Sequence, residues 1–356
     1  MKNRILVFSA PLALALVTPV LADIADGFDV ATPADFDVSE YVYKISESDF
    51  NFKRSLAKAP VNEWAYQSDL SRVETQQVIR ENQDGIYASA VVDISEGATF
   101  TVPEGDHYQI IQVIDMQNYV AGVAYAGDSI TITTDDVTYG DYVYLNMRVP
   151  ILSEEKGGLE ETLRLQKLAT IEASSARPYA SPDLVLPQER TEEIRAALIE
   201  DVNNGALTHT RSVNGTPYTS RPQDHLYGTA YGWGGLGLPD AAYWPFMNKT
   251  EIVDGQNQPS SATFTPPDIQ EERGGFWSVT IYDEDGWLAK DISAISNTQA
   301  EPNEDGTYTI NFNNPGAKNN LETAVPFTAL FRFYLPDSKE SAIEYIDERS
   351  DELVIE

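Results

Sequence analysis

The side chains that could carry chemistry are concentrated in three short stretches. The first places a carboxylate between an amide and a phenol, in the order Asn82-x-Asp84-x-x-Tyr87. Asp84 could act there as a hydrogen-bond acceptor or a base, with Asn82 and Tyr87 as polar walls of a pocket. The same residues also fit a simple Asp-Gly turn, in which Asn82 bonds to local backbone. The pattern leaves both interpretations open.

A second stretch, residues 225–243 (HLYGTAYGWGGLGLPDAAY), combines a histidine, aromatic rings and glycines. His225, Tyr231 and Trp233 have rings with a polar group, which suits the wall of a ligand cleft. Glycines stand among them at positions 228, 232, 234, 235 and 237. Because glycine weakens helices and strands and permits close backbone approach, we expect irregular structure here. The stretch either lines a cleft or seals a domain interface, and His225 is alternatively a structural hydrogen-bond donor.

The third stretch is a strand-like segment, FTALFRFYLP at 327–336, with Arg332 among aromatic residues. An arginine in such surroundings is either buried and paired or an anion clamp at a pocket, and we expect the structural pairing. The candidate ligand-binding residues are therefore Asn82, Asp84, Tyr87, His225, Tyr231, Trp233 and Arg332.

The histidines and acidic turns form no recognisable metal site. His107, His209 and His225 lack metal-ligand spacing, and the chain has no cysteine. The acidic segments 283–286 and 303–306 lack the length and ligand order of a calcium-binding loop, and their Asp-Gly pairs favour hairpin turns. We therefore expect no metal, and no motif identifies a cofactor.

No motif identifies a reaction either. The chain has no Gly-x-Ser-x-Gly elbow, and the glycines at 232–237 are not followed by the Lys-Ser/Thr of a phosphate loop. If the protein is an enzyme, Asp84 or His225 is the expected acid–base group.

Residues 1–22 have the pattern of a signal peptide. Lys2 and Arg4 precede an apolar run, small residues stand at the cleavage position near Ala22, and two prolines interrupt the run. We expect a periplasmic or secreted protein that does not stay in the membrane after cleavage.

The formal net charge of −32 excludes two classes of partner. Nucleic acid and anionic membrane surfaces both require a basic face. The acidic segment 337–356 is expected to be a solvated tail. Without cysteine, an exported chain of 356 residues must depend on packed cores, and its length suggests two domains.

Alternating apolar residues predict β-strands in both halves of the chain. In DYVYLNMRV, the apolar residues Val143, Leu145, Met147 and Val149 are expected on one face of the strand. The opposite face then carries Tyr142, Tyr144, Asn146 and Arg148. In FWSVTIY, Trp277 is expected in the core, on the face opposite Ser278 and Tyr282.

Helices are predicted at 158–168 and 190–204, and more weakly at 41–56, with a proline-rich linker at 177–187. We expect a mainly β (α+β) protein with two β-sandwich or jelly-roll-like domains joined by a short helical segment. The predicted divisions are a signal peptide (1–22), an N-terminal β domain (23–175), a linker with a helix (176–219), a C-terminal β domain (220–340) and an acidic tail (341–356).

Two blocks of the sequence resemble a known pair of families. ETQQVIRENQDGIYASAVVDISEGATFTVPEGDHYQIIQVID, within 46–172, resembles domain-of-unknown-function family 1254. DHLYGTAYGWGGL, GGFWSVTIYDEDGWL and DGTYTINF, within 220–336, resemble its usual partner, family 1214. The resemblance implies an often exported, largely β protein with two domains and a helical connection. The first family commonly has threonine after Asn-x-Asp, where this chain has Gly85.

The leading hypothesis is an exported protein that binds a small organic molecule between its two halves, with or without a reaction. Its rival is a non-catalytic assembly or surface-interaction module, in which the aromatic stretch contacts another subunit of a homo-oligomer. A carbohydrate-binding variant of the rival would use Trp244 or Trp287 as stacking platforms.

Overall fold

The computed structural model describes residues 32–76, 78–207 and 213–356. The expected signal peptide, residues 1–22, lies outside these ranges. None of the helices within them is both long enough and apolar enough to cross a membrane.

The N-terminal half is built from two antiparallel sheets that enclose a hydrophobic core. The period-2 pattern explains the packing of the central strand β7 (Tyr142–Pro150), because Val143, Leu145, Met147 and Val149 are fully buried between the sheets. The larger sheet has the order β1 (Ala65–Tyr66), β2 (Gly85–Asp93), β7, β4 (Ile110–Ile114), β5 (Val120–Tyr125). The smaller sheet has the order β6 (Ser129–Ile132), β3 (Ala98–Thr101), β8 (Thr170–Ala173), and α2 (Gly158–Leu165) precedes β8.

The C-terminal half repeats this plan with a four-stranded and a three-stranded sheet. Trp277, Phe264 and Phe331 lie in the core between them, which confirms the predicted facing of Trp277. The larger sheet has the order β15 (Ala294–Ser296), β14 (Phe276–Tyr282), β18 (Thr328–Tyr334), β9 (Ala241–Pro245). The smaller sheet has the order β13 (Ser260–Phe264), β16 (Tyr308–Phe312), β17 (Asn320–Leu321). A separate hairpin is formed by β11 (Ile252–Val253) and β12 (Gln256–Asn257). The mainly β, α+β fold is confirmed, while its jelly-roll detail stays a prediction.

The expectation that residues 337–356 form a solvated tail is wrong. Residues 339–349 form α5 (Lys339–Arg349), which packs Ala342, Tyr345 and Ile346 into the C-terminal core. After it, β19 (Val354–Ile355) pairs in parallel with β10 (Met247–Asn248). The acidic composition concealed an apolar stripe at helical spacing, because the acids occupy only the solvent face of α5.

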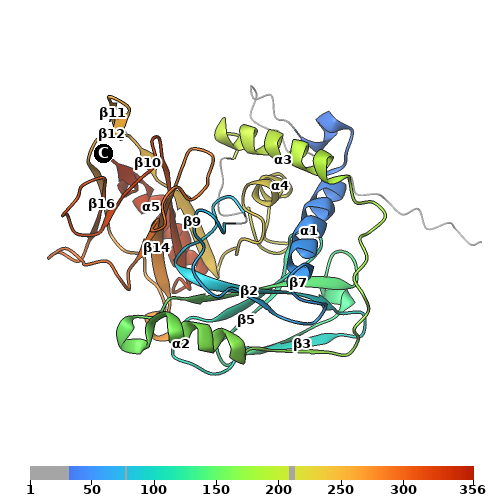
Figure 1. The fold of residues 1–356 in the computed structure, drawn as a ribbon. Coiled ribbons are helices and arrows are strands. Elements are labelled where there is room, and N and C mark those ends of the chain that lie inside the picture. Colours follow the sequence, from blue (N-terminus) through green and yellow to red (C-terminus); the bar gives the residue numbers. More distant parts are fainter. Residues whose placement is uncertain (1–31, 77, 208–212) are drawn as a thin grey trace, which may run out of the picture.

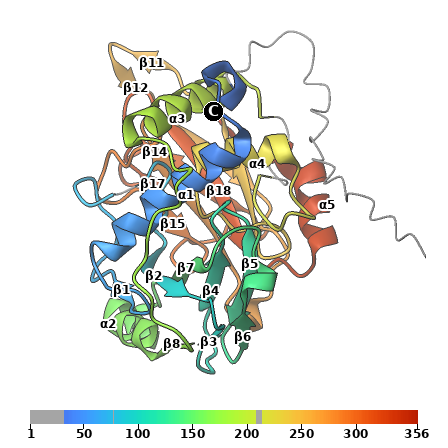
Figure 2. The same cartoon turned by 90° about the vertical axis from the view of Figure 1, so that its right-hand side faces the viewer.

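A helical layer covers one side of the five-stranded sheet, beside the C-terminal half (Figures 1 and 2). It consists of α1 (Glu40–Leu56), α3 (Gln188–Asn203) and α4 (Pro222–Tyr231). Tyr43, Leu198 and Leu226, one from each helix, belong to a shared hydrophobic cluster. Two expectations are therefore corrected: α4 belongs to this layer and not to a β domain starting at 220, and its glycine does not prevent a helix.

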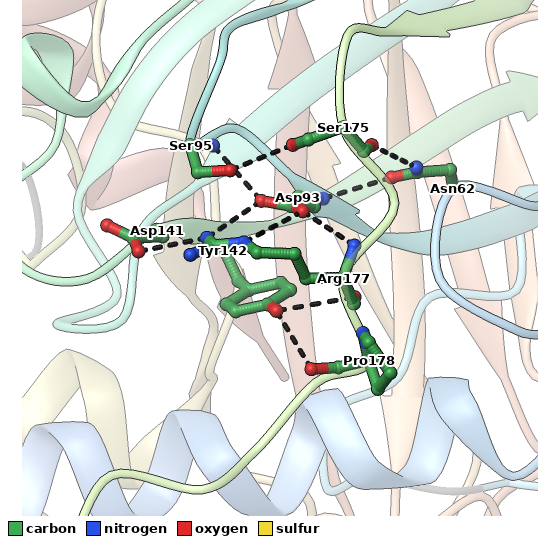
Figure 3. Close-up of polar contacts among 8 residues, drawn as sticks. All are labelled: Asn62, Asp93, Ser95, Asp141, Tyr142, Ser175, Arg177 and Pro178. Carbon is green, nitrogen blue, oxygen red and sulfur yellow. Dashed lines mark hydrogen bonds and ion pairs between the residues drawn. The ribbon is translucent and has the colours of Figure 1, made fainter.

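The linker after the N-terminal half is fastened to the sheet by Arg177 (Figure 3). Its guanidinium Nη2 donates to Asp93 Oδ1 at 2.9 Å and to Asp141 Oδ2 at 2.9 Å, and its backbone N–H donates to Asp93 Oδ2 at 2.8 Å. Tyr142 Oη donates to the carbonyl oxygen of Pro178 at 2.9 Å. Burial opposes a charge on Asp93, but the hydrogen bonds from Arg177 outweigh it and hold the pKa of Asp93 well below its usual range. The hydrogen bonds between Arg177 and Asp93, the last residue of β2, thus hold the start of the linker on the sheet.

Asp93→Asn is expected to lower the free energy of unfolding at pH 7 by about 1–2 kcal/mol, because a charge-assisted contact is lost but half-exposed Arg177 is screened by water. A depressed pKa stabilises the folded state above the unfolded pKa of about 3.9, and this contribution disappears as the pH falls through the folded pKa. The difference between wild type and variant in urea unfolding should therefore shrink below about pH 4. Asp141→Asn, which removes the half-exposed partner, is the control and should change stability little. A pH-independent difference would contradict this prediction.

Candidate ligand-binding cavity

A cavity of about 380 Å³ lies where the two halves and the helical layer meet. Its walls come from β2 and β7 of the five-stranded sheet, β9 and β18 of the four-stranded sheet, and α1 and α4. This volume is in the range of small-molecule sites, which occur preferentially at domain interfaces.

The N-terminal wall is the face of the sheet that points away from its own core. In β7 the residues alternating with the core positions are Tyr144, Asn146 and Arg148, and all three line the cavity. On the neighbouring β2, Tyr87 lies opposite Arg148 in the strand register, and Ser89 lies opposite Asn146. The same alternation that buries Val143 to Val149 therefore gives this wall its polar character.

The C-terminal wall is formed in the same way. In β18, Leu330, Arg332 and Tyr334 alternate with core residues and line the cavity. Tyr243 of β9 lies opposite Arg332 in the register and also lines it. Both faces of this sheet are buried, one against its own core and one against the N-terminal half and the cavity.

The glycine-rich stretch closes the cavity on the helical side. Trp233 Nε1 donates to Ser48 Oγ of α1 at 3.0 Å, and the Trp233 ring meets the Tyr144 ring edge-on at 4.9 Å between centroids. Gly234 has φ of +79°, and a Cβ on Gly235 would lie 2.2 Å from Asn214 Nδ2. The expectation that these glycines permit close backbone approach is confirmed.

A segment at 78–82 crosses one side of the cavity and holds Arg80 against Tyr231. The guanidinium carbon of Arg80 lies 3.4 Å from the centroid of the Tyr231 ring, a cation–π contact with the last residue of α4. Arg80 has φ of +54°, an unusual backbone conformation for a non-glycine residue. Its carbonyl oxygen accepts a hydrogen bond from Arg332 Nη2 at 2.8 Å.

The Asn82–Asp84–Tyr87 group joins the two halves. Asn82 Nδ2 donates to Tyr334 Oη at 2.8 Å, and Ser278 Oγ of β14 donates to Asp84 Oδ2. Burial raises the pKa of Asp84, although the bond from Ser278 opposes the shift. Asn82 and Tyr87 line the cavity, whereas Asp84 does not.

His225 is a fully buried part of the helical layer and does not line the cavity. Its Nε2 donates to the Asn118 carbonyl oxygen at 3.2 Å, its Nδ1 lies 3.4 Å from Lys44 Nζ, and its ring stacks on Tyr119 at 4.0 Å. Burial, followed by the charge of Lys44, lowers the pKa of His225 to about 3. The geometry therefore matches the interpretation of His225 as a structural hydrogen-bond donor, with a ring packed against Tyr119 and bonded to Asn118.

The structure thus brings five candidates to one cavity, namely Asn82, Tyr87, Tyr231, Trp233 and Arg332. The residues that the sequence analysis did not select include Arg80, Tyr144, Asn146, Arg148 and Tyr334. Three of these, Tyr144, Asn146 and Arg148, could have been found from the alternation in β7, since the face opposite a core carries them together. Arg80 had no pattern that could have identified it.

The cavity is basic in a strongly acidic protein. Among the described residues, its lining contains five cations, Arg54, Lys58, Arg80, Arg148 and Arg332, and a single carboxylate, Glu81. In the described ranges no group of three or more His, Asp or Glu side chains is arranged to hold a metal ion. Aromatic rings, amides and cationic groups therefore line the same cavity.

Comparisons with known proteins match two parts of the chain to families of unknown function. Residues 61–148 match the model of a protein of unknown function, DUF1254, and residues 251–338 match that of another, DUF1214. These matches confirm the pairing inferred from the sequence, although the 225–243 stretch lies outside both. No curated protein is significantly similar to this chain.

Two solved structures are similar to this one. The VPA0106 protein from Vibrio parahaemolyticus has a TM-score of 0.60 at 19% sequence identity, with 85% of this chain and 94% of that chain covered. A putative uncharacterized protein from Burkholderia cenocepacia has a TM-score of 0.45 at 15% identity, with 87% and 88% covered. The first likeness supports the fold and nothing further.

Proposed function

We propose that this is an exported binding protein for a small organic molecule, held in the cavity between its two halves. The observation that carries the proposal is the cavity itself, which has the size of a ligand site and is lined by residues from both halves. Its rings, including Tyr87, Tyr231 and Trp233, supply apolar surface, and its arginines and amides supply polar partners. Export rests on the pattern of residues 1–22.

The rival hypotheses have less support from the geometry. Trp233 is occupied inside the chain by Ser48 and Tyr144, so it does not offer a contact for another subunit. Of the two candidates for a carbohydrate-stacking platform, Trp244 packs against the C-terminal core and is not free to stack. Trp287, which is 42% exposed, is the candidate that the carbohydrate hypothesis retains.

Gly232 offers a direct way to close the cavity. It lines the cavity, no atom lies within 4 Å of the position of an added Cβ, and its φ of −168° is outside the left-handed region that favours glycine. Gly232→Phe is therefore expected to fill the cavity without unfolding the protein, and Gly232→Ala is the matched control that leaves it open.

The test is titration calorimetry with benzoate, benzamide, indole-3-acetate, indole-3-acetamide and glucose. We expect at least one of the first four to bind wild type and Gly232→Ala with Kd below about 1 mM, which corresponds to about −4 kcal/mol. Gly232→Phe should weaken that binding at least about 10-fold, a change of about 1.4 kcal/mol. Binding of none of the five, or equal binding to all three proteins, would overturn the proposal, and binding of glucose alone would favour the carbohydrate hypothesis instead.

A further inference from the structure

We propose that the ligand of this cavity is a small organic acid, whose oxyanion binds between the guanidinium groups of Arg148 and Arg332. This inference rests on the proposed function and specifies the class of its ligand. It depends on the position of the two arginines, the hydrogen bonds they lack, and the phenols beside them.

The two arginines occupy equivalent places in the two sheets. Arg148 is on β7, between β2 and β4, and Arg332 is on β18, between β14 and β9. Each is on the face turned away from the core of its own domain, and their exposed fractions are only 8% and 3%. Two guanidinium groups from central strands of separate domains therefore border one cavity.

Their hydrogen bonds leave donors unused. Arg148 Nη2 donates to the Gly234 carbonyl oxygen at 2.7 Å, and Arg332 Nη2 donates to Tyr282 Oη at 2.7 Å as well as to Arg80. All of these acceptors are neutral. Nη1 of Arg148, Arg332 and Arg80 is buried and has no hydrogen-bond partner among the described residues. A buried guanidinium without an anion carries a desolvation cost, and an oxyanion would offset it with bidentate, charge-assisted bonds.

The protein's own carboxylates do not neutralise this cluster. Asp84 is close enough to feel the charges of both Arg148 and Arg332, but it bonds to Ser278 and forms an ion pair with neither in the part of the chain that the structure describes. Asp240 also interacts electrostatically with Arg148, and Asp283 with Arg80, but neither carboxylate forms an ion pair with these arginines among the described residues. In a chain with 56 acidic and 24 basic residues, this local reversal of sign concentrates anions in the cavity.

Two phenols add neutral donors beside the arginines. Tyr334 Oη accepts a hydrogen bond from Asn82 Nδ2, and Tyr243 Oη accepts one from the Leu236 backbone N–H at 3.0 Å. Because each oxygen already accepts a bond, its own O–H proton is available to donate, and both residues line the cavity. Beside guanidinium groups, donors of this kind suit an oxyanion better than an ammonium group.

The rest of the lining explains why the anion should be organic. Tyr66, Tyr144 and Trp233 provide aromatic surface, and the cavity of about 380 Å³ is far larger than an inorganic anion requires. A carboxylate attached to an apolar or aromatic body satisfies both parts of the lining.

The experiment compares each acid with its neutral amide on the full-length protein. Benzoate and benzamide have nearly the same shape, as do indole-3-acetate and its amide, so calorimetry isolates the contribution of the charge. We expect wild type to bind at least one acid about 10–100-fold more tightly than its amide, as hydrogen bonds to charged groups are worth about 1.5–3 kcal/mol. Inorganic phosphate should bind more weakly than that acid.

Arg148→Gln and Arg332→Gln should each remove most of the preference for the acid and leave binding of the amide within about threefold of wild type. Arg349→Gln, at a half-exposed arginine of α5 that pairs with Glu352, is the control and should change neither. Circular dichroism establishes whether each variant folds, and the comparison of acid and amide on wild type decides the question even if a variant does not fold.

Failure of this inference can be distinguished from failure of the proposed function. If an amide binds as tightly as its acid, or if the arginine variants retain the preference, the organic-acid assignment is wrong while cavity binding stands. If phosphate binds more tightly than every acid, the ligand class is an inorganic or phosphorylated anion and the assignment is also wrong. If no acid or amide binds wild type, the proposed function itself is overturned.

Discussion

Trp277→Ala is expected to lower the free energy of unfolding by about 3–5 kcal/mol, the range for removing a large aromatic side chain from a close-packed core. Trp277 is 1% exposed and lies at the centre of the aromatic packing between the C-terminal sheets. Its ring meets Tyr308 at 4.7 Å and Phe264 at 5.1 Å, both edge-on. The other side of β14 faces the N-terminal half, so alanine would leave a cavity that the surrounding sheets cannot easily fill.

Guanidinium chloride unfolding followed by circular dichroism measures this loss. Trp287→Ala, the same substitution at a ring that is 42% exposed, is the matched control and should change stability by only about 0.5 kcal/mol. A loss at Trp277 no greater than that at Trp287 would contradict the described packing of the C-terminal core.

Gly228→Ala is expected to destabilise the protein by about 1–3 kcal/mol, which reverses the usual sign of this substitution in a helix. Alanine normally stabilises a helix interior by about 0.5–1 kcal/mol relative to glycine. At position 228, however, the added Cβ would lie 2.3 Å from the backbone oxygen of Val213 and 3.0 Å from its carbonyl carbon. Backbone cannot yield as a flexible side chain does, so α4 must shift away from residue 213.

The same shift should reshape the cavity, because Gly228, Val213 and Tyr231 all line it. Gly232→Ala is the control, since its added Cβ meets no atom within 4 Å. We expect Gly228→Ala to unfold at lower urea concentration than wild type and Gly232→Ala to unfold at the same concentration. Equal stability of all three proteins would show that α4 and the segment at 213 do not approach as closely as described.

Alternation along single strands was enough to place many side chains. In β7 it predicted that Val143 to Val149, at every second position, lie on the face opposite Tyr144, Asn146 and Arg148. The structure confirms both sets, with the first in the core and the second along the cavity. Tetrahedral geometry at successive Cα atoms produces this pattern whatever the rest of the chain does. The same pattern cannot say whether the second face meets water or another domain.

Two elements show where composition misled. Glycine at 228 argued against a helix, but α4 forms around it because only glycine permits the contact with Val213. The acidic segment after 337 suggested a solvated tail, but Tyr345 and Ile346 of α5 belong to the C-terminal core. Tertiary packing overrides a weak local preference when the buried area is large enough.

Arg332 illustrates the same limit within the site. From its aromatic neighbours we expected a buried, paired arginine, and the burial is confirmed. The described residues supply it with neutral acceptors and no ion-pair partner, which favours the anion-clamp alternative.

The sequence by itself determined the β-rich architecture, the two family blocks and the two faces of β7 and β14, because these depend on residue spacing along the chain. Only the tertiary structure decided that the polar faces of β7 and β18 border one cavity, that Arg80 contacts Tyr231 of the helical layer, and that His225 lies outside the cavity. Such contacts join residues far apart in sequence, and they arise from the packing of whole sheets and helices, which no local pattern encodes.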